Sequence, residues 1–342
     1  MASLFERIRE ADIGIRPQVP ETSLEESPSL SAALGCLVLL KTEHLQPTGS
    51  FKVRGATNKI RVLGETARRR GVLTASTGNH GLGVARAGRL AGVAVTVYMA
   101  ASAPTTKRRA IEALGADVVF VDGPPLDAEL EARRQSELQD RPYVPPYNDL
   151  DTMAGQGTIA LELHRKAPDL DAVFVAVGGG GLVGGIGAAM KHLAPAARVV
   201  GVWPEASQCM LKAIRAGAIV ETVERDTLSD STAGAIEPGS VTFPICREVI
   251  DEMVTVSEDE IAGAMRRIAE GERWIVEGAA GVALAGLVRT ADSYRGKKVA
   301  VILCGRNVAF ETFLAAMERA GTPSAGEVAR ESAHESRVEG TR

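Results

Sequence analysis

Short apolar runs alternate with amphipathic segments over most of the chain. The apolar runs, which have the length and composition of buried strands, lie at 36–41, 71–75, 93–99, 117–121, 172–177, 199–203 and 298–304. Segments with apolar residues at helical spacing lie at 4–13, 55–63, 81–90, 105–114, 126–139, 157–166, 185–193, 258–270, 279–288 and 309–320. Because strands that alternate with helices favour parallel sheets, the pattern predicts an α/β fold with two open parallel sheets.

Composition narrows the range of partners. The chain has 342 residues and a formal net charge of −4, and aromatic residues make up 4%. Without a basic excess or many aromatic side chains, no nucleic-acid partner is expected. Charged residues occur within the first ten positions, where a signal peptide would be apolar, and no uncharged apolar run reaches membrane-spanning length. We therefore expect a cytoplasmic protein with no membrane partner.

Four consecutive glycines, Gly178, Gly179, Gly180 and Gly181, follow the apolar run 172–177. Such a run is costly in backbone entropy, and it makes sense where the backbone must approach a phosphate and offer it several N–H donors. The segment also satisfies the dinucleotide fingerprint G-x-G-x-x-G, with Glu205 about 20 residues later at a predicted strand end. From these residues alone, a nicotinamide cofactor stays open as an alternative.

Three further segments carry candidate chemistry. Lys52 follows a turn at a predicted helix start, where burial would make its amine nucleophilic, although an ordinary surface lysine is the simpler interpretation. Residues 76–81 form a strand-to-helix turn that could hold a carboxylate or only cap the helix. Cys304 ends a strand, where its thiol could bond a heterocyclic nitrogen or be a small buried side chain.

Together and in this order, the segments SFKVRGA (50–56), STGNHG (76–81), GGGG (178–181) and the strand end at Cys304 resemble the fold type II pyridoxal-phosphate enzymes. The resemblance covers about residues 22–313 and is nearest to the serine/threonine dehydratase branch, with its serine racemase-like and hydroxyectoine-utilisation dehydratase-like members. It implies a tryptophan synthase β-like fold with the active site between two domains. These are a discontinuous large cofactor-binding domain, 1–73 and 149–320, and a small substrate-loop domain, 74–148. The polar residues 321–342 are expected to be disordered.

The resemblance also implies the cofactor and the roles of individual residues. Pyridoxal 5′-phosphate is the expected cofactor, a small amino acid the substrate, and a homodimer the assembly. Lys52 would hold the cofactor as an imine and move the Cα proton, and Thr77, a serine in racemase-like members, is the second catalytic candidate. The residues expected to bind the cofactor are Phe51, Lys52, Asn79, Gly178, Gly179, Gly180, Gly181, Leu182, Glu277 and Cys304. Those expected to bind the substrate are Ser76, Thr77, Gly78, Asn79 and His80.

The activity that the resemblance implies is α,β-elimination. A β-hydroxy amino acid such as L-threonine or L-serine would lose its Cα proton and its hydroxyl and give a 2-oxo acid and ammonia. A thiol beside the pyridine nitrogen leaves the ring a weaker electron sink than an aspartate would, which suits prompt loss of a β-substituent. No metal site is expected, because Leu211 stands where metal-binding members carry an acid. The absence of a long regulatory extension after residue 313 favours a catabolic enzyme.

Several alternatives stay open. The segment SDSTAG (229–234) differs from the D-G-x-A-type run of relatives, so the substrate need not be plain threonine. The chain could be a dehydratase for another hydroxylated amino acid, as in hydroxyectoine or 3-hydroxyaspartate catabolism, or a serine or aspartate racemase. An NAD-dependent dehydrogenase and a non-catalytic ligand sensor are alternatives of a different class.

Overall fold

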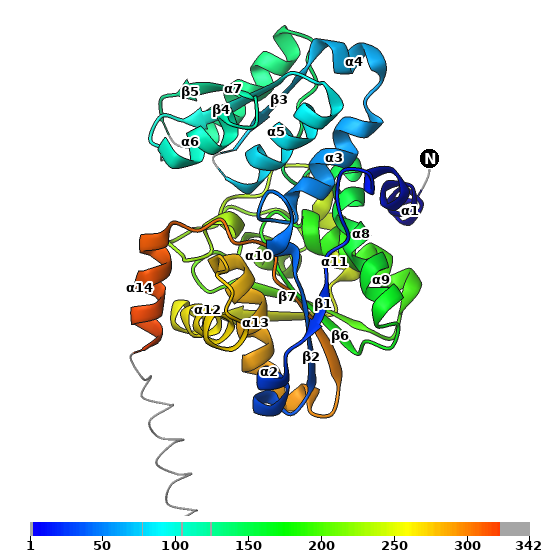
Figure 1. Ribbon diagram of the computed structural model, residues 1–342, viewed down its shortest axis with the longest axis vertical. Helices are drawn as coiled ribbons and strands as arrows, with labels where there is room; N and C mark the ends of the chain where they lie inside the picture. Colours follow the sequence, from blue (N-terminus) through cyan, green and yellow to red (C-terminus); the bar gives the residue numbers. More distant parts are fainter. Residues whose placement is uncertain (1–2, 77, 104, 124, 322–342) are drawn as a thin grey trace, which may run out of the picture.

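The chain forms two separate sheets (Figure 1). The computed structural model describes residues 3–76, 78–103, 105–123 and 125–321. The larger sheet has six strands in the order β1-β2-β9-β6-β7-β8, with β1 antiparallel to β2 and the other pairs parallel. The smaller sheet has three parallel strands in the order β3-β4-β5. These sheets confirm the predicted α/β fold.

Most strands coincide with the apolar runs of the sequence. The larger sheet contains β1 (Leu24–Glu26), β2 (Leu37–Lys41), β6 (Ala172–Ala176), β7 (Arg198–Pro204), β8 (Glu252–Val256) and β9 (Lys298–Ile302). The smaller sheet contains β3 (Val72–Ala75), β4 (Val95–Ala100) and β5 (Asp117–Val121). Only β1 and β8 of these are not predicted, because β1 is three residues long and β8 lies at a half-exposed edge of its sheet.

The helices also follow the predicted segments. In chain order they are α1 (Leu4–Ile15), α2 (Pro28–Leu34), α3 (Lys52–Val62), α4 (Glu65–Arg70), α5 (Asn79–Ala91), α6 (Thr105–Glu112), α7 (Pro125–Leu138), α8 (Leu150–Lys166), α9 (Gly181–Leu193), α10 (Cys209–Ala216), α11 (Thr242–Val249), α12 (Glu258–Glu272), α13 (Gly278–Thr290) and α14 (Phe310–Ala320). Short 3₁₀ turns lie at η1 (Glu43–Leu45), η2 (Asp230–Thr232) and η3 (Ala291–Tyr294). The helices α2, α4, α10 and α11 are too short to show a helical period in the sequence.

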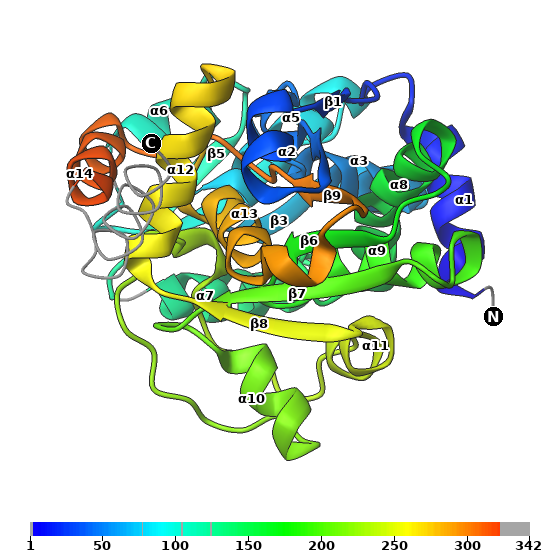
Figure 2. The ribbon, with the colours of Figure 1, turned by 90° about the horizontal axis from the view of Figure 1, so that it is seen from below.

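Each sheet has its own apolar core. Strands β6, β7 and β9 are buried over almost their whole length, and α13 packs against them (Figure 2). The smaller sheet is covered by α5, α6 and α7, with Val97, Met99 and Ile111 at the centre of its core. Helix α3 contacts both α5 and α8 and so joins the two parts (Figure 1). No helix among the described residues has the length and apolar character needed to cross a bilayer.

The topology brings several predicted motifs to one place. Strands β3, β6 and β9 end just before Ser76, the glycine run and Cys304, respectively. The loop before Lys52 is fixed to the end of β9, because the N–H of Phe51 donates to the carbonyl of Cys304 at 3.0 Å. Carboxyl ends of parallel strands are where open α/β sheets bind ligands. The predicted domain boundaries stay predictions, and the tail expected to be disordered lies, apart from Gly321, outside the described residues.

Candidate active site

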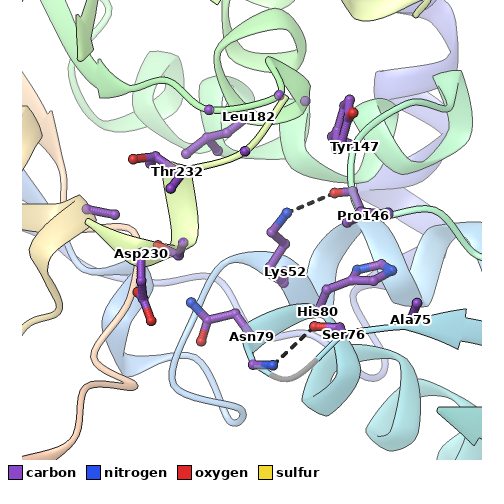
Figure 3. Close-up of a pocket in the computed structure, with 18 of the residues that line it drawn as sticks. Lys52, Ala75, Ser76, Asn79, His80, Pro146, Tyr147, Leu182, Asp230 and Thr232 are labelled. Atoms are coloured by element: carbon purple, nitrogen blue, oxygen red, sulfur yellow. Dashed lines mark hydrogen bonds between the residues drawn. The ribbon is translucent and has the colours of Figure 1, made fainter. Parts of the chain in front are cut away.

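A cavity of about 440 Å³ lies between the two sheets (Figure 3). Its walls come from the ends of β3, β6 and β9, the start of α3, and segments near residues 146 and 230. It is lined by all the predicted site residues that the structure describes: Phe51, Lys52, Ser76, Gly78, Asn79, His80, Gly178, Gly179, Gly180, Gly181, Leu182, Glu277 and Cys304. Thr77, the remaining one, lies outside the described residues. Segments far apart in the sequence therefore meet at one site.

Lys52 is the first residue of α3, and its side chain extends into the cavity (Figure 3). Its amine donates a hydrogen bond to the carbonyl of Pro146 at 2.8 Å. Burial lowers the pKa of this amine to about 8, and the nearby Cys304 and Glu277 only partly oppose that shift. A lysine with such a pKa is deprotonated near neutral pH far more often than a surface lysine, so its amine can act as a nucleophile or a base.

The glycine run forms an anion cradle between β6 and α9. Among the described residues, the N–H groups of residues 178–183 donate no hydrogen bond. These donors lie at the positive end of the α9 dipole, where phosphate groups bind. A Cβ on Gly179 would lie 2.6 Å from the Tyr147 ring, and Gly180 has a left-handed φ of 89°. Both positions therefore require glycine.

Side chains of α11 hold the carbonyls of this loop. The Thr242 hydroxyl donates to the carbonyl of Gly179 at 2.7 Å, and the Cys246 thiol donates to that of Gly180 at 3.5 Å. Because these oxygens are held on the α11 side of the loop, the N–H groups are left available to a ligand. The cradle is thus formed before any ligand binds.

A buried carboxyl group, Glu277, lies beside Asn79 and Cys304. The Asn79 amide donates to both Glu277 oxygens at 2.9 Å, and the Cys304 sulfur lies 4.0 Å from Oε1. Burial raises the pKa of Glu277 to about 7, although bonds from Asn79 and Ser231 lower it. Burial also raises the pKa of the Cys304 thiol, which is therefore neutral at physiological pH.

The segment after β3 places further donors at the cavity. The Ser76 hydroxyl accepts from the N–H of Gly78 at 3.1 Å, and α5 begins at Asn79 (Figure 3). His80 Nε2 lies 2.9 Å from the carbonyl of Val144, which can only accept, so Nε2 carries the proton. Burial and the charge of Lys52 lower the pKa of His80 to about 3, and its ring is neutral. The start of α5 thus places the positive end of the helix dipole and uncharged hydrogen-bond donors where an anionic group could bind.

A comparison with known protein families matches residues 15–305 to the family described as pyridoxal-phosphate dependent enzyme. The chain belongs to this family. Pyridoxal 5′-phosphate is accordingly its cofactor, and the site fits that molecule: unpaired N–H groups suit its phosphate, and the amine of Lys52 suits its aldehyde.

Known relatives of this pyridoxal-phosphate enzyme include ammonia-lyases. The L-threonine ammonia-lyase of Thermotoga maritima is 40% identical over 305 residues, which are 89% of this chain and 75% of that protein. The L-threo-3-hydroxyaspartate ammonia-lyase of a Pseudomonas species is 37% identical to this chain. The aligned residues are 85% of this chain and 91% of that protein. The solved structure of the processed threonine deaminase isoform 2 of Solanum lycopersicum superposes on this chain with a TM-score of 0.90. The two sequences are 34% identical, and the superposition covers 93% of this chain and 94% of that chain.

Membership of the pyridoxal-phosphate family decides against the nicotinamide interpretation of the glycine run. In the structure, Glu205 follows β7 as expected, but it lies outside the cavity lining and contacts Arg289, with 3.5 Å between Oε1 and Nη1. The fingerprint match arises because both kinds of site place glycines between a strand and a helix to admit phosphate. Within the described ranges, no group of three or more His, Cys, Asp or Glu side chains is arranged to hold a metal.

Several cavity residues were not among the predicted site residues. They are Lys107, Glu129, Pro146, Tyr147, Asp230, Ser231, Thr232 and Asn307. Lys107 of α6 and Asp230 of η2 form an ion pair with 3.7 Å between Nζ and Oδ2. Glu129 lies on α7, where Arg133 bonds it at 3.0 Å. Of these, only the residues of the segment 229–234 belong to a segment singled out in the sequence, because the others reach the cavity through the packing of helices and loops that no local motif records.

Proposed function

We propose that this enzyme is an amino-acid ammonia-lyase that converts a β-hydroxy amino acid, such as L-threonine or L-serine, into a 2-oxo acid and ammonia. The observation that carries the proposal is that the amine of Lys52 and the glycine cradle line one cavity. The similarity to threonine and 3-hydroxyaspartate ammonia-lyases supports a β-hydroxy amino acid as the substrate. The reaction loses water from the substrate and regains it on hydrolysis, so it needs no oxidant or reductant.

Lys52 is the proposed attachment point and proton carrier. Bound pyridoxal 5′-phosphate supplies an aldehyde that condenses with amines and a conjugated ring that delocalises the electron pair left on Cα. The amine of Lys52, with its pKa of about 8, can both bond the aldehyde and accept the proton from Cα near neutral pH. The N–H groups of Gly178, Gly179, Gly180, Gly181 and Leu182 are proposed to hold the phosphate.

The other residues that line the cavity are proposed to tune the cofactor ring and to orient the substrate. Asn79 and Cys304 would face the ring hydroxyl and the ring nitrogen, and a neutral thiol does not force that nitrogen to be protonated. Phe51 would pack near the ring, and Glu277 would act through Asn79. Ser76, Thr77, Gly78, Asn79 and His80 are proposed to hold the substrate carboxylate at the start of α5. Thr77 is also retained as a second catalytic candidate.

The proposal extends to organisation. We propose the two domains implied by the resemblance, with 1–73 and 149–320 in one and 74–148 in the other, and a homodimer that works in the cytoplasm. Sedimentation equilibrium on the purified protein tests the dimer, and a monomer across the micromolar range would contradict it.

The first test of the proposed function is whether the protein binds the cofactor through Lys52. The purified protein mixed with pyridoxal 5′-phosphate should be yellow, and borohydride reduction followed by peptide mapping should place a pyridoxyl adduct on Lys52. Lys52→Ala should lose the visible absorbance and the adduct. Lys59→Ala is a matched control on the same helix, where the amine pairs with Asp149 at 2.6 Å outside the cavity, and it should keep both.

The substrate is tested by a panel of amino acids. Release of 2-oxo acid and ammonia is measured with L-threonine, L-serine, 3-hydroxyaspartate and their D-isomers. Turnover of at least one β-hydroxy amino acid, lost in Lys52→Ala, is expected. Interconversion of serine or aspartate enantiomers without ammonia release would instead favour a racemase.

A further inference from the structure

Asn307 lies where three parts of the site meet. Its side-chain nitrogen donates to the carbonyl of Thr48 at 2.8 Å and to Oδ1 of Asn79 at 2.6 Å. Its backbone N–H donates to Oε2 of Glu277 at 3.2 Å. Thr48 belongs to the loop that precedes Lys52, whereas Asn79 begins a helix that covers the smaller sheet. One residue thus bonds the loop before Lys52, the buried carboxyl and the other side of the cavity.

These bonds determine which way each amide is turned. The carbonyl of Thr48 can only accept, so the side-chain nitrogen of Asn307, rather than its oxygen, must face it. The second hydrogen of that nitrogen then points at Asn79, which must present its oxygen. The nitrogen of Asn79 is consequently turned to Glu277, whose two carboxyl oxygens each lie 2.9 Å from it. Because the nitrogen is equidistant from both oxygens, one of its hydrogens can be shared between them, and the second is left for the cavity. The fixed backbone carbonyl of Thr48 therefore determines, through Asn307, how the Asn79 amide is oriented in the cavity.

The backbone is shaped to let Asn307 approach this closely. Gly49 has a φ of 75°, and a Cβ there would lie 2.5 Å from Oδ1 of Asn307. The carbonyl of Gly49 also accepts from the N–H of Arg306 at 2.9 Å. Because any side chain at position 49 would displace Asn307, this contact depends on the glycine in the loop that precedes Lys52.

We propose that Asn307 is a positioning residue that fixes the orientation of the Asn79 amide and so presents its N–H donor, not its oxygen, to the cofactor site. The inference rests on the proposed function, in which Asn79 faces the ring hydroxyl. A free amide could turn over and offer an oxygen instead, which would repel an ionised ring hydroxyl. Asn307 acts through Asn79 and does not itself need to touch the cofactor.

Asn307→Asp tests the orientation without changing the shape of the side chain. The aspartate keeps an oxygen at each position but cannot donate to Thr48 or Asn79. We expect the dissociation constant for pyridoxal 5′-phosphate to rise about tenfold or more, and the visible absorbance maximum of the loaded protein to shift. Asn58→Asp is the control: Asn58 is also buried and bonds a backbone carbonyl, that of Asp151 at 2.7 Å, but lies outside the cavity, so affinity and spectrum should stay as in the wild type.

A double-mutant cycle separates positioning from a general structural effect. If Asn307 acts through Asn79, then Asn79→Ala combined with Asn307→Asp should bind the cofactor no more weakly than Asn79→Ala alone. Additive losses, or an unchanged spectrum in Asn307→Asp, would overturn the inference. Should the aspartate variant fail to fold, Asn307→Ala, which adds no charge, is put through the same cycle and decides it. If the wild type itself binds no pyridoxal 5′-phosphate, the proposed function fails instead.

Discussion

Lys52 and Glu277 show what burial does to single side chains in this site. Burial lowers the pKa of the amine to about 8 and raises that of the carboxyl to about 7, so both groups are moved towards neutral pH. Neither shift would follow from the residue type, and both arise because the cavity is closed on several sides. Groups that can gain or lose a proton near pH 7 are the ones that proton transfer requires.

The lowered pKa of Lys52 has a cost in stability. The pKa of Lys52 is about 8 in the folded protein and 10.5 in the unfolded chain, so folding disfavours the charged amine. This loss of folding free energy is fully present below about pH 8 and disappears as the pH rises to 10.5. Lys52→Met should therefore raise the free energy of unfolding of the cofactor-free protein by about 2 kcal/mol at pH 7. Urea unfolding at pH 7 and pH 10 measures the gain. A gain that does not shrink at pH 10 would contradict this explanation.

The loop between β6 and α9 shows how a secondary-structure element prepares a binding site. The strand ends at Ala176 and the helix begins at Gly181, and the N–H groups of Gly178, Gly179 and Gly180 between them make no hydrogen bond to any described residue. Thr242 and Cys246, on a helix more than sixty residues later, hold the carbonyls of this loop. The cradle therefore depends on two elements, and only one of them carries a recognisable motif.

Substitution within this loop should affect binding more than folding. In Gly179→Ala the new Cβ would lie 2.6 Å from the Tyr147 ring, and we expect the affinity for pyridoxal 5′-phosphate to fall at least about tenfold. Gly263→Ala is the matched control, because it lies inside α12 with no atom within 4 Å of its Cβ. That change should leave affinity intact and stabilise the helix by about 0.5–1 kcal/mol. Titration by absorbance measures affinity, and equal affinities in the two variants would refute the steric argument.

The sequence predicted elements best where burial is complete. Strands β6, β7 and β9 are enclosed between helices, so their residues are apolar without interruption and can be recognised. The two edge strands of the larger sheet, β1 and β8, carry mixed residues and were missed. In the site, motif residues such as Lys52 and Gly179 were singled out by the sequence, and both line the cavity. Lys107 and Glu129 were not, because their place depends on how α6 and α7 lie across the cavity.

Across the molecule, a buried charge network joins segments that are distant in the sequence. The Arg54 guanidinium bonds Glu43 at 2.7 Å and Glu162 at 2.6 Å, and the Lys41 amine bonds Glu162 at 2.5 Å. All four side chains are fully buried, and they come from β2, η1, α3 and α8. Arg54 is two residues after Lys52, so the network also fixes the start of the helix that carries the amine.

This network should make the fold sensitive to acid. Arg54 and Lys41 lower the pKa of Glu162 to about 2, below the unfolded value of 4.5, although burial acts the other way. The stability that ionised Glu162 contributes to the fold is present above pH 4.5 and is lost as the pH falls towards 2. Glu162→Gln should lower the free energy of unfolding at pH 7 by about 3 kcal/mol, and this difference should shrink in acid. Urea unfolding between pH 2 and 7 measures it.

A surface pair provides the control for this prediction. Glu65 and Arg69 on α4 form an ion pair with both side chains largely exposed, so Glu65→Gln should hardly change stability at any pH. Equal effects of the two substitutions would show that burial of Glu162 is not the source of the acid sensitivity.

The position of β9 in the larger sheet has a consequence for how the chain is made. This strand is synthesised after all the other strands that the structure describes, yet it lies between β2 and β6 and pairs with both. Until the ribosome has released residues 298–302, two apolar strand edges stay open, whereas β3, β4 and β5 follow one another and can pair early. Incomplete nascent chains are therefore exposed to edge-to-edge association during translation, and premature termination before β9 leaves a product that aggregates rather than one that folds with a missing end.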